Sequence, residues 1–195
     1  MGVNLKQKLI VAFITAGLSS PAAFVAYDLS LPSEGYVPTV YLDTGNLQTF
    51  CVGHLALKGE VLKSSYTEQE CMTIFASDWK KHLAQIDSVV KVPYKSEWER
   101  QALTDFTFNN GIANVKSSTL LKKLNSGDHV GACQQLTRWT KGRVKGVLVT
   151  LRGLVTRRDN TMPYCLGELT PDKQTEYEQF EREYNEALKR QKESR

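Results

Sequence analysis

An uncharged segment near the start of the chain, Leu9–Tyr27, constrains the fold more than any other feature. It runs for 19 residues, follows Lys6 and Lys8, and ends before Asp28. This length is just enough for a helix to cross a bilayer, and the two lysines favour a cytoplasmic start, which sends the rest of the chain to the far side. Many small residues and Pro21 make the free energy of insertion marginal, so the segment could leave the membrane again.

Three interpretations of this segment stay open. The first is a weak signal-anchor, and the second is a cleaved signal peptide, for which Ser20, Pro21 and Ala22 offer small residues at a processing site. The third is a buried helix of a soluble domain. The first two both export the protein and both permit disulfides.

The composition predicts a single globular domain with additions at both ends. A chain of 195 residues with 41% hydrophobic and 24% charged residues can bury one ordinary core. The net charge is +4, and residues 138–158 hold seven Lys and Arg but no Asp or Glu. This stretch indicates either a polyanionic partner, such as a bacterial cell wall, or an ordinary solvated face. Nucleic acid is not expected, because no nucleic-acid-binding motif accompanies the charge.

Three polar residues, Glu34, Asp43 and Thr49, follow within a turn-rich stretch that reads as a short hairpin over residues 40–52. Hydrolysis of a glycosidic bond needs such groups. One carboxyl gives its proton to the leaving oxygen, and an ionised one activates or positions water on the opposite face of the sugar. A nearby hydroxyl can hold the same water. The spacing alone is weak, because two solvated loop charges would give the same pattern.

Further motifs follow in order and carry a resemblance. They are Gly53-His54, the stretch Phe106–Asn125, Arg138-Trp139 and Thr156-Arg157-Arg158. From about Pro32 to Cys165 the chain resembles the phage-type lysozymes, glycoside hydrolase family 24. The resemblance implies that Glu34 is the general acid, that Asp43 positions or activates the water, and that Thr49 helps to hold it. Nothing in the residues argues for a metal or an organic cofactor.

The resemblance also implies a fold and a reaction. The fold would be α+β and lysozyme-like, with a small lobe containing the β hairpin, a larger helical lobe and a cleft between them, preceded by a membrane-active helix. The reaction would be hydrolysis, with inversion, of the β-1,4 bond between N-acetylmuramic acid and N-acetylglucosamine in peptidoglycan. The enzyme would be a monomeric phage endolysin that lyses a Gram-negative host.

The leader resembles the signal-arrest-release segments of some phage lysozymes. On this interpretation residues 9–27 hold the enzyme in the host inner membrane first, and the released enzyme then works in the periplasm.

Two other functions stay open as alternatives. A lytic transglycosylase would give the water-holding pair Asp43 and Thr49 no task. A non-catalytic wall-binding or lysis-regulating protein would have no need for Glu34, Asp43 and Thr49 together.

Two capping boxes predict helices. Thr67–Glu70 opens a helix of about twenty residues, and Ser96–Glu99 opens another that ends near Asn110-Gly111. Asp78 lies on the otherwise apolar face of the first helix, where a carboxylate needs a partner. The resemblance places His54 near this helix, so we expect a structural ion pair between them.

The resemblance places Asn109, Asn110 and Ser118 on the far side of the cleft, where amides and hydroxyls bind sugar. A structural alternative stays open, because Asn110 can end one helix and Ser118 can cap the next.

The cysteines number four, at positions 51, 71, 133 and 165, with no CxxC pair and no histidines at ligand spacing, so zinc is not expected. Four cysteines allow three disulfide connectivities. We favour Cys51 with Cys71 and Cys133 with Cys165, because each pair then stays within one lobe. Four buried thiols are the alternative.

We expect three parts along the chain: a leader at residues 1–28, a catalytic domain at 29–168 and a charged amphipathic helical tail at 169–195. Tyr177, Phe180 and Tyr184 recur at helical spacing in the tail, which we expect to dock on the catalytic domain or on a partner. Residues 147–158 are interpreted as one more helix. Pro163 departs from the family pattern and leaves the packing there in question.

Overall fold

The structure is a computed structural model that describes residues 4–43, 45–144 and 146–194. Its contacts divide the chain into two compact units. The first unit comprises Met1–Lys80 and Glu176–Arg195, and the second comprises Lys81–Thr175. The leader and the tail from Glu176 onward thus belong to the same unit as Glu34, Asp43 and Thr49.

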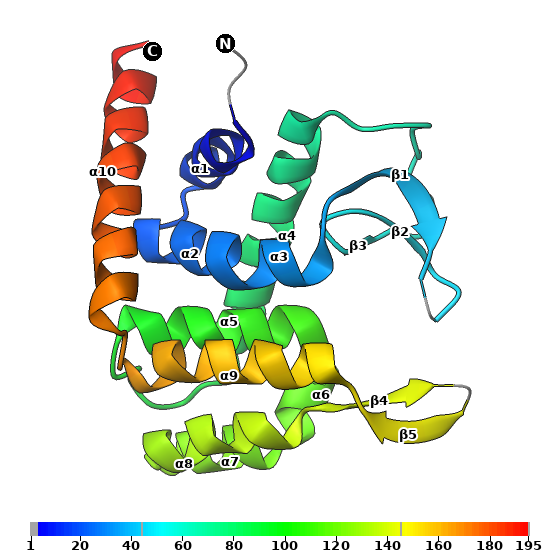
Figure 1. The fold of residues 1–195 in the computed structure, drawn as a ribbon, viewed down its shortest axis with the longest axis vertical. Coiled ribbons are helices and arrows are strands. Elements are labelled where there is room, and N and C mark those ends of the chain that lie inside the picture. Colours follow the sequence, from blue (N-terminus) through cyan, green and yellow to red (C-terminus); the bar gives the residue numbers. More distant parts are fainter. Residues whose placement is uncertain (1–3, 44, 145, 195) are drawn as a thin grey trace. The chain divides into compact units, whose positions relative to one another are not determined.

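The apolar leader is folded into the core of the first unit as a series of short helices (Figure 1). These are α1 (Leu5–Thr15), α2 (Ser20–Val25), the π-helical turn η1 (Ala26–Ser30) and α3 (Leu31–Glu34). Gly17 takes a φ of +74°, which a right-handed helix does not allow, and Ser19 caps α2 through its side chain. The chain therefore turns between α1 and α2. Leu9, Phe13 and Val25 are fully buried, as expected for helices that form part of a core.

Membrane crossing needs a longer helix than any of these. Within the described residues, no helix combines the length and the apolar content that a bilayer span requires.

The three-stranded sheet of the first unit is antiparallel, with strand order β1-β2-β3. Its strands are β1 (Val37–Leu42), β2 (Gln48–Cys51) and β3 (His54–Leu55). Leu42 pairs with Gln48, and Tyr41 pairs with Thr49. The expected hairpin is confirmed, since Asp43 directly follows β1 and Thr49 lies in β2. Thr44, which belongs to the hairpin predicted over residues 40–52, lies outside the described residues.

Helix α4 (Glu68–Asp87) begins at the expected capping box. The Glu70 N–H donates to Thr67 Oγ1 at 3.2 Å, and the Thr67 N–H donates to Glu70 Oε2 at 2.8 Å. Within the first unit α1 packs on α4 through Phe13, whose ring lies 5.8 Å from that of Phe75 and 6.1 Å from that of Trp79. All three side chains are buried.

The tail forms the long helix α10 (Pro171–Glu193), drawn from orange to red in Figure 1. Tyr177, Phe180 and Tyr184 are its buried residues. They recur every three or four positions, which places them on one face of a helix. This face packs on Ser20, Phe24 and Tyr27 of the leader, a site that the expectation of docking on the catalytic domain or on a partner did not include.

The second unit is mainly helical. It contains α5 (Glu97–Asn110), α6 (Ile112–Ser117), α7 (Thr119–Asn125), α8 (His129–Gln134), the 3-10 turn η2 (Gln135–Arg138), the hairpin β4 (Lys141–Val144) and β5 (Val147–Thr150), and α9 (Arg152–Leu166). Helices α5 and α9 lie side by side (Figure 1). Between them the Arg157 guanidinium donates to Asp105 Oδ1 at 2.8 Å, and both side chains are almost fully buried.

The helix expected over residues 147–158 is wrong over residues 147–151. Residues 147–150 form strand β5, and the helix starts only at Arg152. Gly146, with a φ of +82°, turns the chain back on itself, and the β-branched Val147 and Val149 favour the strand that follows. Helix α9 also continues through Pro163 to Leu166, so the departure from the family pattern does not end it.

Candidate active site

Glu34 is the last residue of α3, and it lies close to the turn between β2 and β3. The helix stops there because Gly35 has a φ of +76°. Gly53 in the turn also has a positive φ, of +66°. A Cβ atom at Gly53 would lie only 3.1 Å from Glu34 Oε2. The absence of a side chain at Gly53 therefore leaves the space in which the Glu34 carboxylate sits.

Asp43 is held in a fixed orientation by the hairpin loop. Its Oδ1 accepts hydrogen bonds from the backbone N–H groups of Gly45 and Leu47, each at 2.8 Å. Its own N–H donates to the Leu47 carbonyl at 2.9 Å. An aspartate that bonds to the backbone of its own turn loses rotamer freedom. The loop thus positions a carboxylate at the end of β1.

Thr49 is a buried residue of β2, with 3% of its surface exposed. Its Oγ1 donates to the Leu47 carbonyl at 3.1 Å, and the N–H of the same leucine donates to Asp43. The sequence predicted that Asp43 and Thr49 lie on neighbouring strands or the turn between them, and the loop indeed joins the two through Leu47.

Tyr41 is a residue that the sequence analysis missed. It lies opposite Thr49 in the register of β1 and β2, and paired residues point to the same face of a sheet. The pKa of its phenol is raised by partial burial first, and then by the negative charges of Glu34 and Asp43. Both carboxylates therefore lie within electrostatic range of one phenol. The signal in the sequence was the spacing of Tyr41 and Asp43, because residues two apart in the predicted hairpin lie on the same face.

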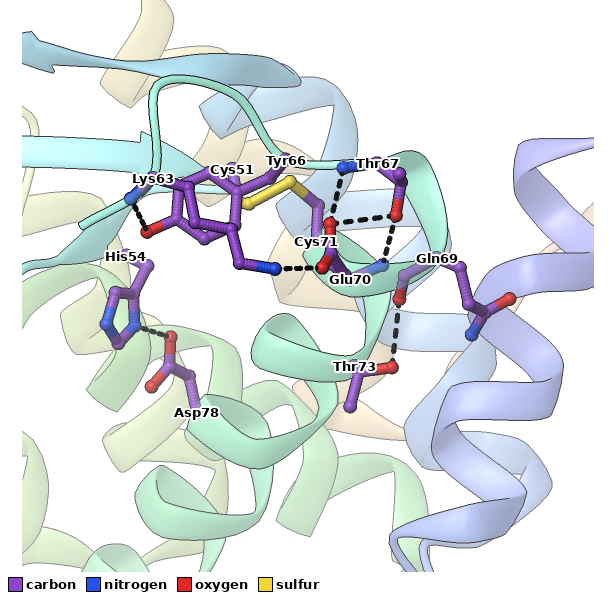
Figure 2. The surroundings of a disulfide bond; sticks show 10 residues. All are labelled: Cys51, His54, Lys63, Tyr66, Thr67, Gln69, Glu70, Cys71, Thr73 and Asp78. Carbon is purple, nitrogen blue, oxygen red and sulfur yellow. Dashed lines mark hydrogen bonds and ion pairs between the residues drawn. A yellow bond between two sulfur atoms is a disulfide. The ribbon is translucent and has the colours of Figure 1, made fainter. Parts of the chain in front are cut away.

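His54 and Asp78 make the contact expected from the sequence, and Figure 2 shows the two side chains facing each other. His54 Nδ1 lies 2.6 Å from Asp78 Oδ2, while Nε2 lies 3.3 Å from Glu60 Oε2. The hydrogen bond to Asp78 raises the pKa of His54, against the opposing effect of burial, and Glu60 adds to the rise. The pair links β3 to the middle of α4.

Both expected disulfides are present, Cys51–Cys71 and Cys133–Cys165. The first joins the end of β2 to the first turn of α4, beside the capping box (Figure 2). Together with the bond between His54 and Asp78, this disulfide attaches strands β2 and β3 to α4 at two positions along the helix. The second disulfide joins α8 to α9 within the second unit.

The residues predicted to bind sugar, Asn109, Asn110 and Ser118, all lie in the second unit. Ser118 is buried, and its Oγ accepts the N–H of Leu121 at 3.0 Å, which is the helix-capping bond left open as the alternative. Asn109 Oδ1 accepts a hydrogen bond from Arg158. Asn110 Nδ2 donates to the Phe106 carbonyl at 2.9 Å. Binding of sugar by these residues stays a prediction.

The basic stretch is only partly a surface feature. Arg157 and Arg158 are buried, and Arg158 also donates to the Trp139 carbonyl at 3.2 Å. Arg138, Lys141 and Arg143 are exposed, whereas Lys145 lies outside the described residues. Across the part of the chain that the structure describes, no group of three or more His, Cys, Asp or Glu side chains is arranged to hold a metal ion.

Comparison with known proteins gives consistent matches. A family model described as phage lysozyme matches residues 32–161. The SAR-endolysin of Escherichia phage Mu is 38% identical over 134 residues, which cover 69% of this chain and 73% of the relative. The SAR-endolysin of Enterobacteria phage PA-2 is 38% identical over 164 residues, which cover 82% of this chain and 94% of the relative.

Solved structures share the fold. The endolysin from Escherichia coli O157:H7 phage FAHEc1 superposes with a TM-score of 0.66 at 27% identity, covering 78% of this chain and 94% of that one. The muramidase domain of SpmX from Asticaccaulis excentricus superposes with a TM-score of 0.64 at 20% identity, covering 77% and 95%, and shows the fold alone. The architecture is therefore lysozyme-like α+β, with a small antiparallel sheet and a mostly helical body.

Proposed function

The chain belongs to the phage lysozyme family, which makes it a glycoside hydrolase of the muramidase type, and we propose that Glu34, Asp43 and Thr49 carry out its reaction. The substrate is peptidoglycan, and the bond cleaved is the β-1,4 linkage between N-acetylmuramic acid and N-acetylglucosamine. The observation that carries this proposal is that all three residues lie at the sheet β1-β2-β3, where Glu34 lies beside Gly53 in the turn between β2 and β3, and Asp43 and Thr49 are joined through Leu47.

Each residue has a distinct role in the proposed reaction. Glu34 donates a proton to the glycosidic oxygen as the bond to the anomeric carbon breaks. Asp43, fixed by the N–H groups of Gly45 and Leu47, holds and activates a water molecule on the other face of the sugar. Thr49 contributes a hydroxyl to the same water. Attack by this water from the face opposite the leaving group inverts the configuration at the anomeric carbon.

Replacement of the general acid tests the assignment. Glu34→Gln keeps the size of the side chain but removes the proton donor, so hydrolysis of purified wall should fall by about 10²-fold or more while the protein stays folded. Asp159→Asn removes an exposed carboxylate of α9 and should leave turnover unchanged. Substantial turnover by Glu34→Gln would reject Glu34 as the acid.

Product analysis separates the enzymatic alternatives. Mass spectrometry should find reducing N-acetylmuramic acid ends, whereas anhydro ends would identify a lytic transglycosylase. NMR of fresh product should show the inverted anomer, and a retained anomer would mean a covalent intermediate instead of direct attack by water.

We also propose a route of export. The similarity to SAR-endolysins and the uncharged residues 9–27 support a leader, residues 1–28, that first lies in the host inner membrane, followed by release into the periplasm. The catalytic domain is then residues 29–168, the tail is residues 169–195, and the released enzyme is a monomer. Mass analysis of the protein recovered from membrane and periplasmic fractions tests this, since release without cleavage requires the full-length mass in both.

A further inference from the structure

Helix α10 has a buried face that contacts the N-terminal leader. It begins at Pro171, after the last residue that the phage lysozyme model matches. The interactions between α10 and the leader are aromatic, polar and ionic, and they involve successive turns of the helix. The aromatic contacts involve Phe24, the polar contacts involve the break near Leu18, and the ionic contact involves Lys6.

The aromatic contacts centre on Phe24 of α2. Its ring lies 5.3 Å from the ring of Tyr177 and 5.3 Å from that of Phe180, and both pairs meet edge to face. Tyr27 adds a tilted contact with Phe180 at 5.8 Å. Edge-to-face pairs with centroids about 4.5–7 Å apart are the favoured geometry for aromatic rings. The apolar side of α10 therefore has a matched partner in the leader.

The polar contacts lie where the leader stops being a continuous helix, between α1 and α2. In a continuous helix the Leu18 carbonyl would accept the N–H of Ala22. Here the Ala22 N–H instead donates to the Ser19 side chain at 3.4 Å, and the Leu18 carbonyl accepts the hydroxyl of Tyr184. The carbonyl that the break leaves without a helical partner is thus satisfied by α10.

Ser20 makes a second polar contact at the break. Its hydroxyl lies 3.0 Å from the phenol oxygen of Tyr177 and donates to Glu181 Oε1 at 2.9 Å. Ser20 is buried, so these bonds offset the desolvation cost of its hydroxyl. In a bilayer the same hydroxyl would have no such partners.

The charged end of the leader also has a partner on α10. Lys6 Nζ lies 2.8 Å from Glu183 Oε1 and 5.2 Å from the centroid of the Phe180 ring. This lysine is one of the two that favour a cytoplasmic start in the inserted state. Its charge is thus balanced in the folded form.

We propose that the inner face of α10, Tyr177, Phe180, Glu181, Glu183 and Tyr184, is an intramolecular receptor for the leader in its broken form. This inference rests on the proposed membrane-inserted state and names what regulates departure from it. A binding partner shifts an equilibrium only by its preference for one state. Because α10 binds the leader bent at Gly17 and not a straight spanning helix, it draws the leader out of the membrane and holds it in the first unit.

The test uses full-length protein with an intact leader. Tyr177→Phe combined with Tyr184→Phe keeps both rings and removes only the hydroxyls that contact Ser20 and Leu18. Arg182→Ala combined with Asn185→Ala, two exposed positions on the same helix, is the matched control. The readouts are the membrane-bound fraction at a fixed time, the time of lysis, and the specific activity of purified released enzyme on wall.

We expect the Tyr177→Phe/Tyr184→Phe variant to leave at least about threefold more protein in the membrane and to delay lysis, with the control behaving as the unmodified chain. The released enzyme of this variant should have unchanged specific activity. Phe180→Ala should give a larger effect in the same direction. Equal release of all variants would overturn the receptor, as would equal losses in the variant and its control. Failure of the unmodified enzyme to cleave wall, or absence of any membrane-bound full-length form, would instead refute the proposed function.

Discussion

At the scale of single residues, the site depends on backbone conformations that only particular residues adopt. Gly53 has a positive φ and also leaves the space next to the Glu34 carboxylate. In the sequence, Gly53 is recognisable only as part of the Gly53-His54 motif. Its place beside Glu34 cannot be predicted from the sequence, because a close approach between two separate segments of the chain depends on tertiary structure.

Gly53→Ala should therefore impair both stability and catalysis. The Cβ atom would lie 3.1 Å from Glu34 Oε2, so the carboxylate must shift, and small displacements of a catalytic group cost about 10–10²-fold in rate. Gly59→Ala is the matched control, since Gly59 has a φ of +85° and a Cβ atom there would meet no other atom within 4 Å. Both variants should lose about 1–2 kcal/mol of stability from backbone strain. Equal kcat values for both would show that Gly53 has no effect on Glu34.

At the scale of elements, short-range signals predicted structure well and longer-range ones did not. The capping box at Thr67 marked the start of α4 because its hydrogen bonds lie within one turn of chain. The strand β5 was mistaken for helix because a short apolar run with basic flanks fits both. The turn at Gly146 makes this run a strand of a hairpin, and the sequence alone does not fix the conformation of that glycine.

The connection between β3 and α4 through His54 and Asp78 should depend on pH. The pKa of His54 is raised from its ordinary value of 6.5, chiefly by the Asp78 bond. A raised pKa means that the folded state binds the proton more tightly, so the stabilisation is complete below the ordinary pKa and is lost as pH rises through the raised pKa. His54→Gln should lower the free energy of unfolding by about 2 kcal/mol near pH ~5.5 and by less near pH ~8.5.

A double-mutant cycle in urea measures this link. His54→Gln and Asp78→Asn should show a coupling free energy that shrinks with rising pH, and kcat of the folded enzyme should change little. Additive effects at every pH would exclude the pair. Glu60→Gln serves as a comparison, since Glu60 contacts the other nitrogen of the ring at the longer distance of 3.3 Å.

At the scale of the whole molecule, the leader is the segment whose folded structure its own sequence predicted least. The length, flanking lysines and small residues of the leader left a signal-anchor, a cleaved signal peptide and a buried helix all open. In the folded protein its apolar residues form core, and the break at Gly17 is stabilised by Ser19 and by Tyr184 of α10. Tyr184 lies 166 residues beyond Leu18 along the chain, which is why local patterns could not reveal the break.

The same segment cannot lie in the bilayer and in the core at once, which predicts control of activity by topology. Tyr27 precedes Glu34 by seven residues, at most about 25 Å of extended chain, so an inserted leader keeps the general acid near the membrane and prevents α1 and α2 from packing in the core. No cysteine precedes Cys51, so thiol exchange from within the leader is not available as a switch.

Gly17→Leu with Ser19→Leu and Ser20→Leu should hold full-length protein in the membrane and delay lysis. The leucines favour insertion, and they also disfavour the folded form, because Gly17 has a φ of +74° and Ser19 and Ser20 make the capping and α10 bonds. Gly17→Asn is the control at the same position, since asparagine tolerates this φ and lowers hydrophobicity, and it should release at least as fast as the unmodified chain. Collapse of the membrane potential should hasten release of the unmodified protein. A mature protein that starts near Ala23, with the leader absent from every active fraction, would replace this control with simple signal-peptide export.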